Sequence, residues 1–180
     1  MSTRFSRWLG VGIAALAVTA FGTTASAQQA PGEQVGSVRV VHGLRGLVAD
    51  IYLDGNLALP TFQPERATDP LSIPAGDHLV EIRTAGAAKS DTPLLAQNVT
   101  VPGGFEGSLV AHLGSDGTPT LTAYADDLTP VPAGQTRIVV RHAAAADGVS
   151  VLLNDQPAIT SLSPNAEGTD VVAAGDYKWP

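Results

Sequence analysis

Short apolar and β-branched runs, each closed by Gly, Pro, Asn or Asp, follow one another through most of this chain. Residues 77–83 show the pattern most plainly. One face carries His78, Val80 and Ile82, and the other carries Leu79, Glu81 and Arg83. A period of two predicts a strand with one face in a core and the other largely in solvent.

The same pattern predicts strands along the rest of the chain, and no window outside the first 27 residues has a convincing helical period. Asp54-Gly55 and Asp116-Gly117 lie between apolar runs, where glycine allows the positive φ of a tight turn. The expected strands are residues 38–42, 48–53, 77–84, 94–101, 107–113 and 118–125, with weaker ones at 57–61 and 71–73.

Two stretches one hundred positions apart are alike: VRVVHGLRGLVADIYLDG at residues 38–55 and IVVRHAAAADGVSVLLND at 138–155. They share Val40/Val140, His42/His142 and Leu53/Leu153. A second match follows in the same order, because Ala-Gly-Asp-His at 75–78 corresponds to Ala-Gly-Asp-Tyr at 174–177. Two anchors in nearly the same register predict tandem copies of one domain.

These stretches resemble the bacterial extracellular family known as domain of unknown function 4397. The resemblance rests on Val-Arg-Val-Val-His at 38–42, the strand and turn at 49–55, and Ile-Pro-Ala-Gly-Asp-His at 73–78. The chain departs from the usual pattern at 43–45, where it has Gly-Leu-Arg and such domains tend to have Ala-Ser-Pro. The resemblance implies an exported, often tandem, immunoglobulin-like sandwich of unsettled role, sometimes on cell-surface or wall-associated proteins, and supplies no catalytic residues.

The predicted fold is all-β: an immunoglobulin-like antiparallel β-sandwich, one complete domain plus a partial second copy. The predicted boundaries are a signal peptide at 1–27, a tether at 28–37, a β-sandwich domain at 38–126, a Pro-containing linker at 127–135 and an incomplete second β domain at 136–180. Since the second copy stops after about half a sandwich, we expect a longer protein. Its missing part would complete the domain and hold a wall or membrane anchor. Otherwise the half-domain would self-associate through its strand edges.

The first 27 residues have the three parts of a secretory signal: Arg4 and Arg7, an apolar segment at 9–21, and Ala25-Ser26-Ala27 as cleavage site. The apolar segment is too short to span a bilayer comfortably, so it indicates a cleaved signal and not an anchor. We expect no stable membrane span in the mature chain. The expected location is secreted or extracellular, with cell-wall association through the missing part.

The negative net charge of the chain limits the classes of partner that it can bind. Losing Arg4 and Arg7 with the signal lowers Lys plus Arg from 10 to 8 against 17 Asp plus Glu, which changes the net charge from −7 to −9. An acidic surface repels phosphate backbones and anionic lipids, so we expect no nucleic-acid or membrane-surface partner. Cysteine is absent, so packing and not disulfides must stabilise an exported chain.

Candidate chemistry is sparse. His42 and His142 hold the same repeat position, which favours a structural role over metal ligation, and His112 is expected to be a partly exposed strand residue. No zinc spacing, EF-hand loop, GxSxG elbow or phosphate loop is present. Turn aspartates that could gather around a cation, but more simply form local hydrogen bonds, are Asp50, Asp54, Asp77 and Asp116.

We therefore predict no catalytic, cofactor-binding or metal-binding residues and no cofactor. The predicted function is that of a non-catalytic module for binding, adhesion or spacing at the cell envelope, with an unknown cell-envelope or extracellular partner. The alternative is a secreted hydrolase with a loop-end site near His42 and Asp50. Carbohydrate binding would need exposed aromatic platforms from the few candidates Tyr52, Phe62, Phe105 and Tyr124.

Overall fold

The computed structural model describes residues 34–178; the predicted signal peptide and most of the predicted tether lie outside the described residues. Within this range every regular element is a strand, as predicted, and there is no helix long and apolar enough to cross a membrane. The six strongest predicted strands are confirmed to within three residues at each end. The two weaker ones are also present, as β3 (Asn56–Phe62) and β5 (Leu71–Pro74).

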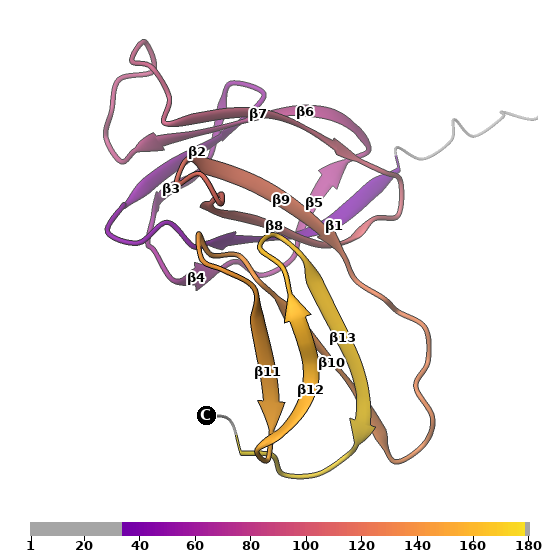
Figure 1. Ribbon diagram of the computed structural model, residues 1–180. Helices are drawn as coiled ribbons and strands as arrows, with labels where there is room; N and C mark the ends of the chain where they lie inside the picture. Colours follow the sequence, from indigo (N-terminus) through magenta and orange to yellow (C-terminus); the bar gives the residue numbers. More distant parts are fainter. Residues whose placement is uncertain (1–33, 179–180) are drawn as a thin grey trace, which may run out of the picture. The chain divides into compact units, whose positions relative to one another are not determined.

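The first half of the described chain forms two facing sheets (Figure 1). One has the order β3-β2-β6-β7, where β2 is Ala49–Leu53, β6 is Gly76–Thr84 and β7 is Leu95–Val101. The other has the order β4-β1-β8-β9, with β5 also paired to β1. Its strands are β1 (Val35–His42), β4 (Arg66–Ala67), β8 (Glu106–Leu113) and β9 (Pro119–Ala125).

One pair departs from the antiparallel prediction: β1 and β8 run parallel, with Val40 opposite Leu109. Parallel neighbours need a long crossover connection. Here residues 43–105 supply it, because they include all four strands of the other sheet. The remaining pairs in residues 34–178 are antiparallel.

The core lies between the two sheets, where inward positions of both meet. It is built from small and branched side chains, chiefly Val38, Val40, Ala49, Ile51, Ile73, Val80, Ile82, Val101, Leu109, Ala111 and Leu121. The predicted alternation in β6 is confirmed for Val80 and Ile82, which are 4% and 1% exposed.

The opposite face of β6 is not simply solvated, and here the sequence prediction is wrong for Arg83. This side chain is buried, because its guanidinium donates to Glu81 at 2.8 Å and to the carbonyls of Ala88 and Asp91, and stacks over the Tyr52 ring. The long stem packs while the charge finds fixed acceptors. Glu81 is thus one partner of a largely buried ion pair.

The second half of the described chain contains two strand pairs. β10 (Gln135–Arg141) pairs with β13 (Glu167–Ala173), and β11 (Val149–Leu153) pairs with β12 (Gln156–Leu162). A small apolar cluster, Val151, Ile159 and Leu162, is buried there. Among residues 34–178, β10 and β11 have strand neighbours on one side only, whereas β1 also pairs with β8 and β2 also pairs with β6.

Local geometry repeats at an offset of 100. The β11–β12 register, including both interruptions, matches that of β2–β3 residue for residue. Positive φ angles recur at Asp54 and Asn154, Thr61 and Ser161, and Glu65 and Asn165. The carbonyls of His42 and His142 accept from the amides of Glu65 and Asn165 at 2.7 and 2.8 Å.

The two halves differ where proline intervenes. β13 is continuous, but the corresponding segment of the first half is split into β4 and β5 around Asp69-Pro70. Proline cannot donate to a strand ladder, so it ends pairing at that point. Thr68 covers the break, since its hydroxyl accepts from the Val40 amide and its own amide donates to the Val40 carbonyl.

Candidate functional site

His42, the residue on which a hydrolytic site would depend, lies among packed side chains. It is 1% exposed, its ring centroid is 5.6 Å from that of Phe62, and its Nδ1 accepts from the Leu44 amide at 3.3 Å. Burial lowers the pKa of His42, because desolvation penalises the imidazolium form. The ring is therefore neutral at neutral pH.

Asp50 is engaged elsewhere. Its two carboxylate oxygens accept from the amides of Thr61 at 2.7 Å and Gly86 at 2.9 Å, and these bonds lower its pKa. Both donors have positive φ, so the carboxylate fixes a bulge in β3 and a turn after β6. In the described residues no hydrogen bond joins Asp50 to His42.

Each of the other turn aspartates accepts hydrogen bonds from its own local partners. Asp54 accepts from His78 and the Leu79 amide, Asp77 from the Thr100 hydroxyl, and Asp116 from the Thr118 amide and hydroxyl. No group of three or more potential metal-ligating side chains occurs within residues 34–178. The structure does not bring these four carboxylates together.

Two further histidines have structural partners. His142 is buried, and its Nε2 bonds the Asp147 carbonyl at 2.9 Å. The prediction that His112 is partly exposed is wrong, because it is 0% exposed. Its ring bridges Thr122 Oγ1 on β9 and the Leu113 carbonyl, and these two bonds satisfy a polar side chain in the interior.

The four aromatic candidates form no exposed platform. Tyr124 is buried, Phe62 stacks on His42, Tyr52 lies under Arg83, and Phe105 is half-buried. A sugar-binding surface requires exposed ring faces, and these residues do not present one.

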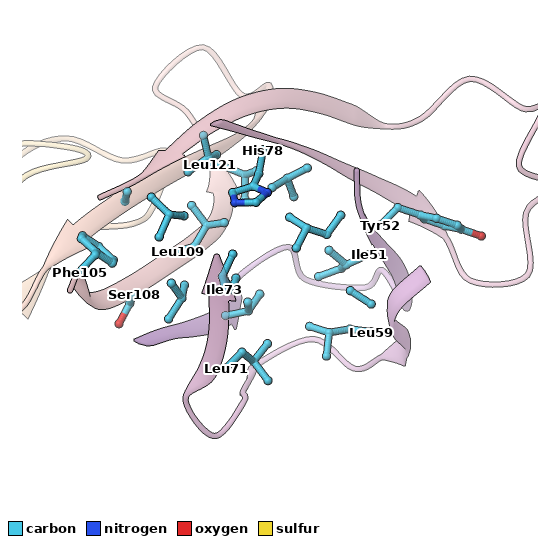
Figure 2. Close-up of a pocket in the computed structure, with 18 of the residues that line it drawn as sticks. Ile51, Tyr52, Leu59, Leu71, Ile73, His78, Phe105, Ser108, Leu109 and Leu121 are labelled. Atoms are coloured by element: carbon cyan, nitrogen blue, oxygen red, sulfur yellow. The ribbon is translucent and has the colours of Figure 1, made fainter. Parts of the chain in front are cut away.

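The feature that sequence reasoning missed is a cavity of about 250 Å³ between the two sheets of the first half (Figure 2). Its wall comes mainly from eight strands and is mostly aliphatic, with Phe105 at one end. Buried residues that line it include Val38, Val40, Ile51, Ile73, Val80, Ile82, Leu109 and Leu121. Alternation identifies such residues as inward, but the volume they leave between the sheets depends on sheet spacing.

The two long edges of the sandwich differ. At one edge, the Gln97 amide on β7 bridges to β9, donating to the Leu121 carbonyl at 3.0 Å and accepting from the Leu121 amide at 3.1 Å. At the other edge, β3 faces β5, and no hydrogen bond joins these strands in the described chain. Lining residues there are half-buried or exposed: Ala58 and Leu59 on β3, and Leu71 and Ser72 on β5. The cavity therefore has one fastened edge and one free edge.

His78 pins the corner where the chain passes from β5 into β6. It is 9% exposed and lines the cavity opposite Leu59 and Leu71 (Figure 2). Nδ1 lies 2.7 Å from Asp54 Oδ2, and Nε2 lies 2.8 Å from the Pro74 carbonyl. Both partners are acceptors, so both ring nitrogens donate only in the protonated imidazolium.

This arrangement raises the pKa of His78, chiefly through the Asp54 hydrogen bond and then through the Pro74 carbonyl. It also lowers the pKa of Asp54, with the His78 hydrogen bond the main cause. A raised histidine pKa contributes stability below the unfolded value of about 6.5, and that contribution is lost as pH rises through the folded pKa. The lowered Asp54 pKa acts oppositely: its contribution is present above about 3.9 and lost as pH falls.

The second half offers a replacement for this pair. Tyr177 Oη donates to the Ala173 carbonyl at 2.7 Å, and Asn154 Oδ1 accepts from the Lys178 amide at 2.8 Å. These contacts correspond to His78 with Pro74 and to Asp54 with the Leu79 amide, which is also 2.8 Å away. The same corner is thus held there without a titrating pair near neutral pH.

We expect the double variant Asp54→Asn/His78→Tyr to keep the fold and to lose part of the pH dependence. The melting temperature of the wild type should fall relative to the variant as pH rises above about 6.5. His42, whose pKa is lowered, acts in the other direction and is present in both proteins. Thermal unfolding from pH 5 to 9 tests this, and parallel curves for the two proteins would contradict the role of His78.

An empty apolar cavity is costly. At about 24 cal/mol per Å³ of cavity, 250 Å³ corresponds to about 6 kcal/mol when the space is dry and unfilled. That is comparable to the whole stability of many domains, about 5–15 kcal/mol. Voids larger than a water molecule are few in ordinary cores. The cavity is therefore the strongest candidate site in the described chain.

Comparison with known proteins gives a family and no function. A search of curated proteins finds no match to this chain. The match to one protein family begins in β1, spans both sheets of the first half and the proline-containing linker, and ends in β11. With residues 36–152 matched, the chain belongs to the family described as "Domain of unknown function (DUF4397)".

Proposed function

We propose that this protein is an exported, non-catalytic β-sandwich module that acts at the cell envelope by binding a small molecule in its inter-sheet cavity. The observation that carries this proposal is the cavity of about 250 Å³, closed by Gln97 at one edge and free of hydrogen bonds between β3 and β5 at the other. A molecule that fills the space recovers contacts that the walls otherwise lack.

The surroundings of the polar side chains support binding over hydrolysis. A hydrolytic site needs a base within hydrogen-bond reach of a nucleophile or substrate. His42 is instead packed against Phe62, and both oxygens of Asp50 already accept backbone amides. The secreted hydrolase near His42 and Asp50 is thus the less favoured alternative.

We further infer that the second half is a partial copy of the first. Supporting this are the β2–β3 register repeated in β11–β12 and the positive φ angles repeated at the same offset. The immunoglobulin-like comparison is part of this proposal. The two sheets of the first half face each other as in a sandwich. The parallel pair β1–β8 departs from the fully antiparallel arrangement that the comparison predicts.

A fragment screen of the mature chain by ligand-detected NMR tests the function. Compounds that bind the wild type but not Val99→Phe, whose added ring fills the cavity, would support binding there. Ala96→Phe on the outer side of the same strand is the matched control. Turnover of an ester or amide fragment by the wild type but not by His42→Ala would favour the hydrolase instead.

Export makes its own prediction. Expressed with its leader in a bacterial host, the chain should be cleaved after Ala27 and appear outside the cytoplasm with Gln28 as its first residue. Intact-mass measurement of the exported protein checks this. Ala25→Leu/Ala27→Leu, which removes the small-residue site, should accumulate uncleaved, and a wild type that keeps residues 1–27 would refute the prediction.

A further inference from the structure

We propose that the ligand of the inter-sheet cavity is an uncharged, apolar molecule of about eight non-hydrogen atoms, such as a one-ring aromatic compound, which enters between β3 and β5. This inference rests on the proposed function and adds the chemical class and size of the ligand.

The volume of the cavity limits the size of the ligand. A cavity of about 150 Å³ lined by Leu, Ile and Phe holds benzene, and pockets that bind drug-sized ligands have volumes of about 300–1,000 Å³. The present volume of about 250 Å³ lies between these limits. At about 30 Å³ for each water-sized atom, it accommodates about eight non-hydrogen atoms.

The side chains that line the cavity determine which ligand polarity it accepts. It contains no Asp, Glu, Lys or Arg side chain. His78 has both ring nitrogens engaged, and its charge in the imidazolium form is balanced by Asp54 2.7 Å away. An anionic ligand would therefore meet a cation that is already paired, and a cationic ligand would meet no acidic side chain in the wall.

The other polar lining side chains offer little to a ligand. The Thr100 hydroxyl donates to Asp77 outside the cavity, and Ser72 is exposed on the edge strand β5. The hydroxyls of Ser108 and Tyr52 point away from the neighbouring lining side chains in Figure 2. Burying a charge or an unbonded polar group here would have no compensating hydrogen bond, so the wall selects against polar ligands.

The difference between the two edges of the sandwich indicates where a ligand enters the cavity. Gln97 fastens β7 to β9 through two hydrogen bonds, whereas in the described chain β3 pairs only with β2 and β5 only with β1. β5 is tied to the facing sheet at its last residue, where the Pro74 carbonyl bonds His78. Pro70 separates β5 from β4, so β5 is a four-residue strand that can move without breaking a longer ladder. Small displacements of β3 and β5 would admit a compact ligand.

Titration of the mature chain with toluene, benzoate and benzylamine tests the class, because these probes share one ring and differ in charge. Ligand-detected NMR should show toluene bound to the wild type and to Ala96→Phe, with binding lost in Val99→Phe. Benzoate and benzylamine should bind about tenfold more weakly or not at all. Should Val99→Phe fail to fold, Leu71→Phe at the free edge fills the same space from β5.

The outcomes separate the two proposals. Tighter binding of benzoate or benzylamine than of toluene, lost in the filled variant, would overturn the apolar class and leave the binding function standing. Failure of all three probes, together with failure of the fragment screen, would overturn both. Toluene binding that persists in both filled variants would place the ligand elsewhere and overturn the cavity assignment.

Discussion

Ile82→Asp should lower the free energy of unfolding by about 4 kcal/mol or more, the largest effect that we expect. Ile82 is 1% exposed, near the end of β6, with strand neighbours on both sides in β2 and β7. The aspartate would be buried against the aliphatic side chains of the core, and His78, the titratable basic side chain in the cavity wall, is already paired with Asp54. A loss of that size removes most of the stability of a domain near the lower end of the usual range of about 5–15 kcal/mol.

Leu57→Asp is the matched control, because it introduces the same charge at a leucine that is 49% exposed on the edge strand β3. Surface changes of this kind usually alter stability by about 0.5 kcal/mol or less. Urea unfolding followed by circular dichroism measures both. Similar midpoints for the two variants would mean that the faces of β6 are reversed. Glu81→Ala is unsuitable as a control, since it would strand the buried guanidinium of Arg83.

Asp50→Ala should lower the free energy of unfolding by about 3 kcal/mol, the second largest effect that we expect. The substitution removes two charge-assisted hydrogen bonds and leaves the amides of Thr61 and Gly86 without their acceptor. Both amides belong to residues with positive φ, whose conformation the carboxylate helps to stabilise.

Asp50→Ser provides a graded comparison, because Ser150 holds the corresponding place in the second half, where Ser161 keeps the positive φ of Thr61. One hydroxyl can replace one acceptor, so the loss should be about half as large. Urea unfolding gives the order, which should be wild type, serine, alanine. An alanine variant as stable as the wild type would show that the bulge does not depend on this carboxylate.

Much of the fold could be predicted because period-two patterns and turn residues are local. Val80, Ile82 and Asp54-Gly55 are read from their neighbours alone, and the strands follow. Arg83 could not be predicted, since its acceptors lie on a loop five to eight residues away whose path the pattern does not determine. His112 was misjudged for a similar reason, because its partner Thr122 belongs to the next strand.

The site was less accessible to prediction. Gln97 gave one signal: it occupies an inward phase of β7 between Leu95 and Val99, where a polar side chain requires a partner. His78 gave another, in the same phase as Val80. Neither reveals a cavity, because empty volume arises from the distance between two sheets and is encoded in no single run of residues.

The one-sided pairing of β10 and β11 has a consequence for how the protein behaves in concentrated solution. An unpaired strand margin exposes a row of amide hydrogens and carbonyl oxygens at regular spacing, which is a template for another extended chain. Arg137 and Arg141 place like charges along β10, whereas the residues of β11, VSVLL, carry none. We therefore expect β11 to be the strand through which molecules associate during storage at high concentration. A lysine introduced into β11 should slow this aggregation while changing the folding stability little.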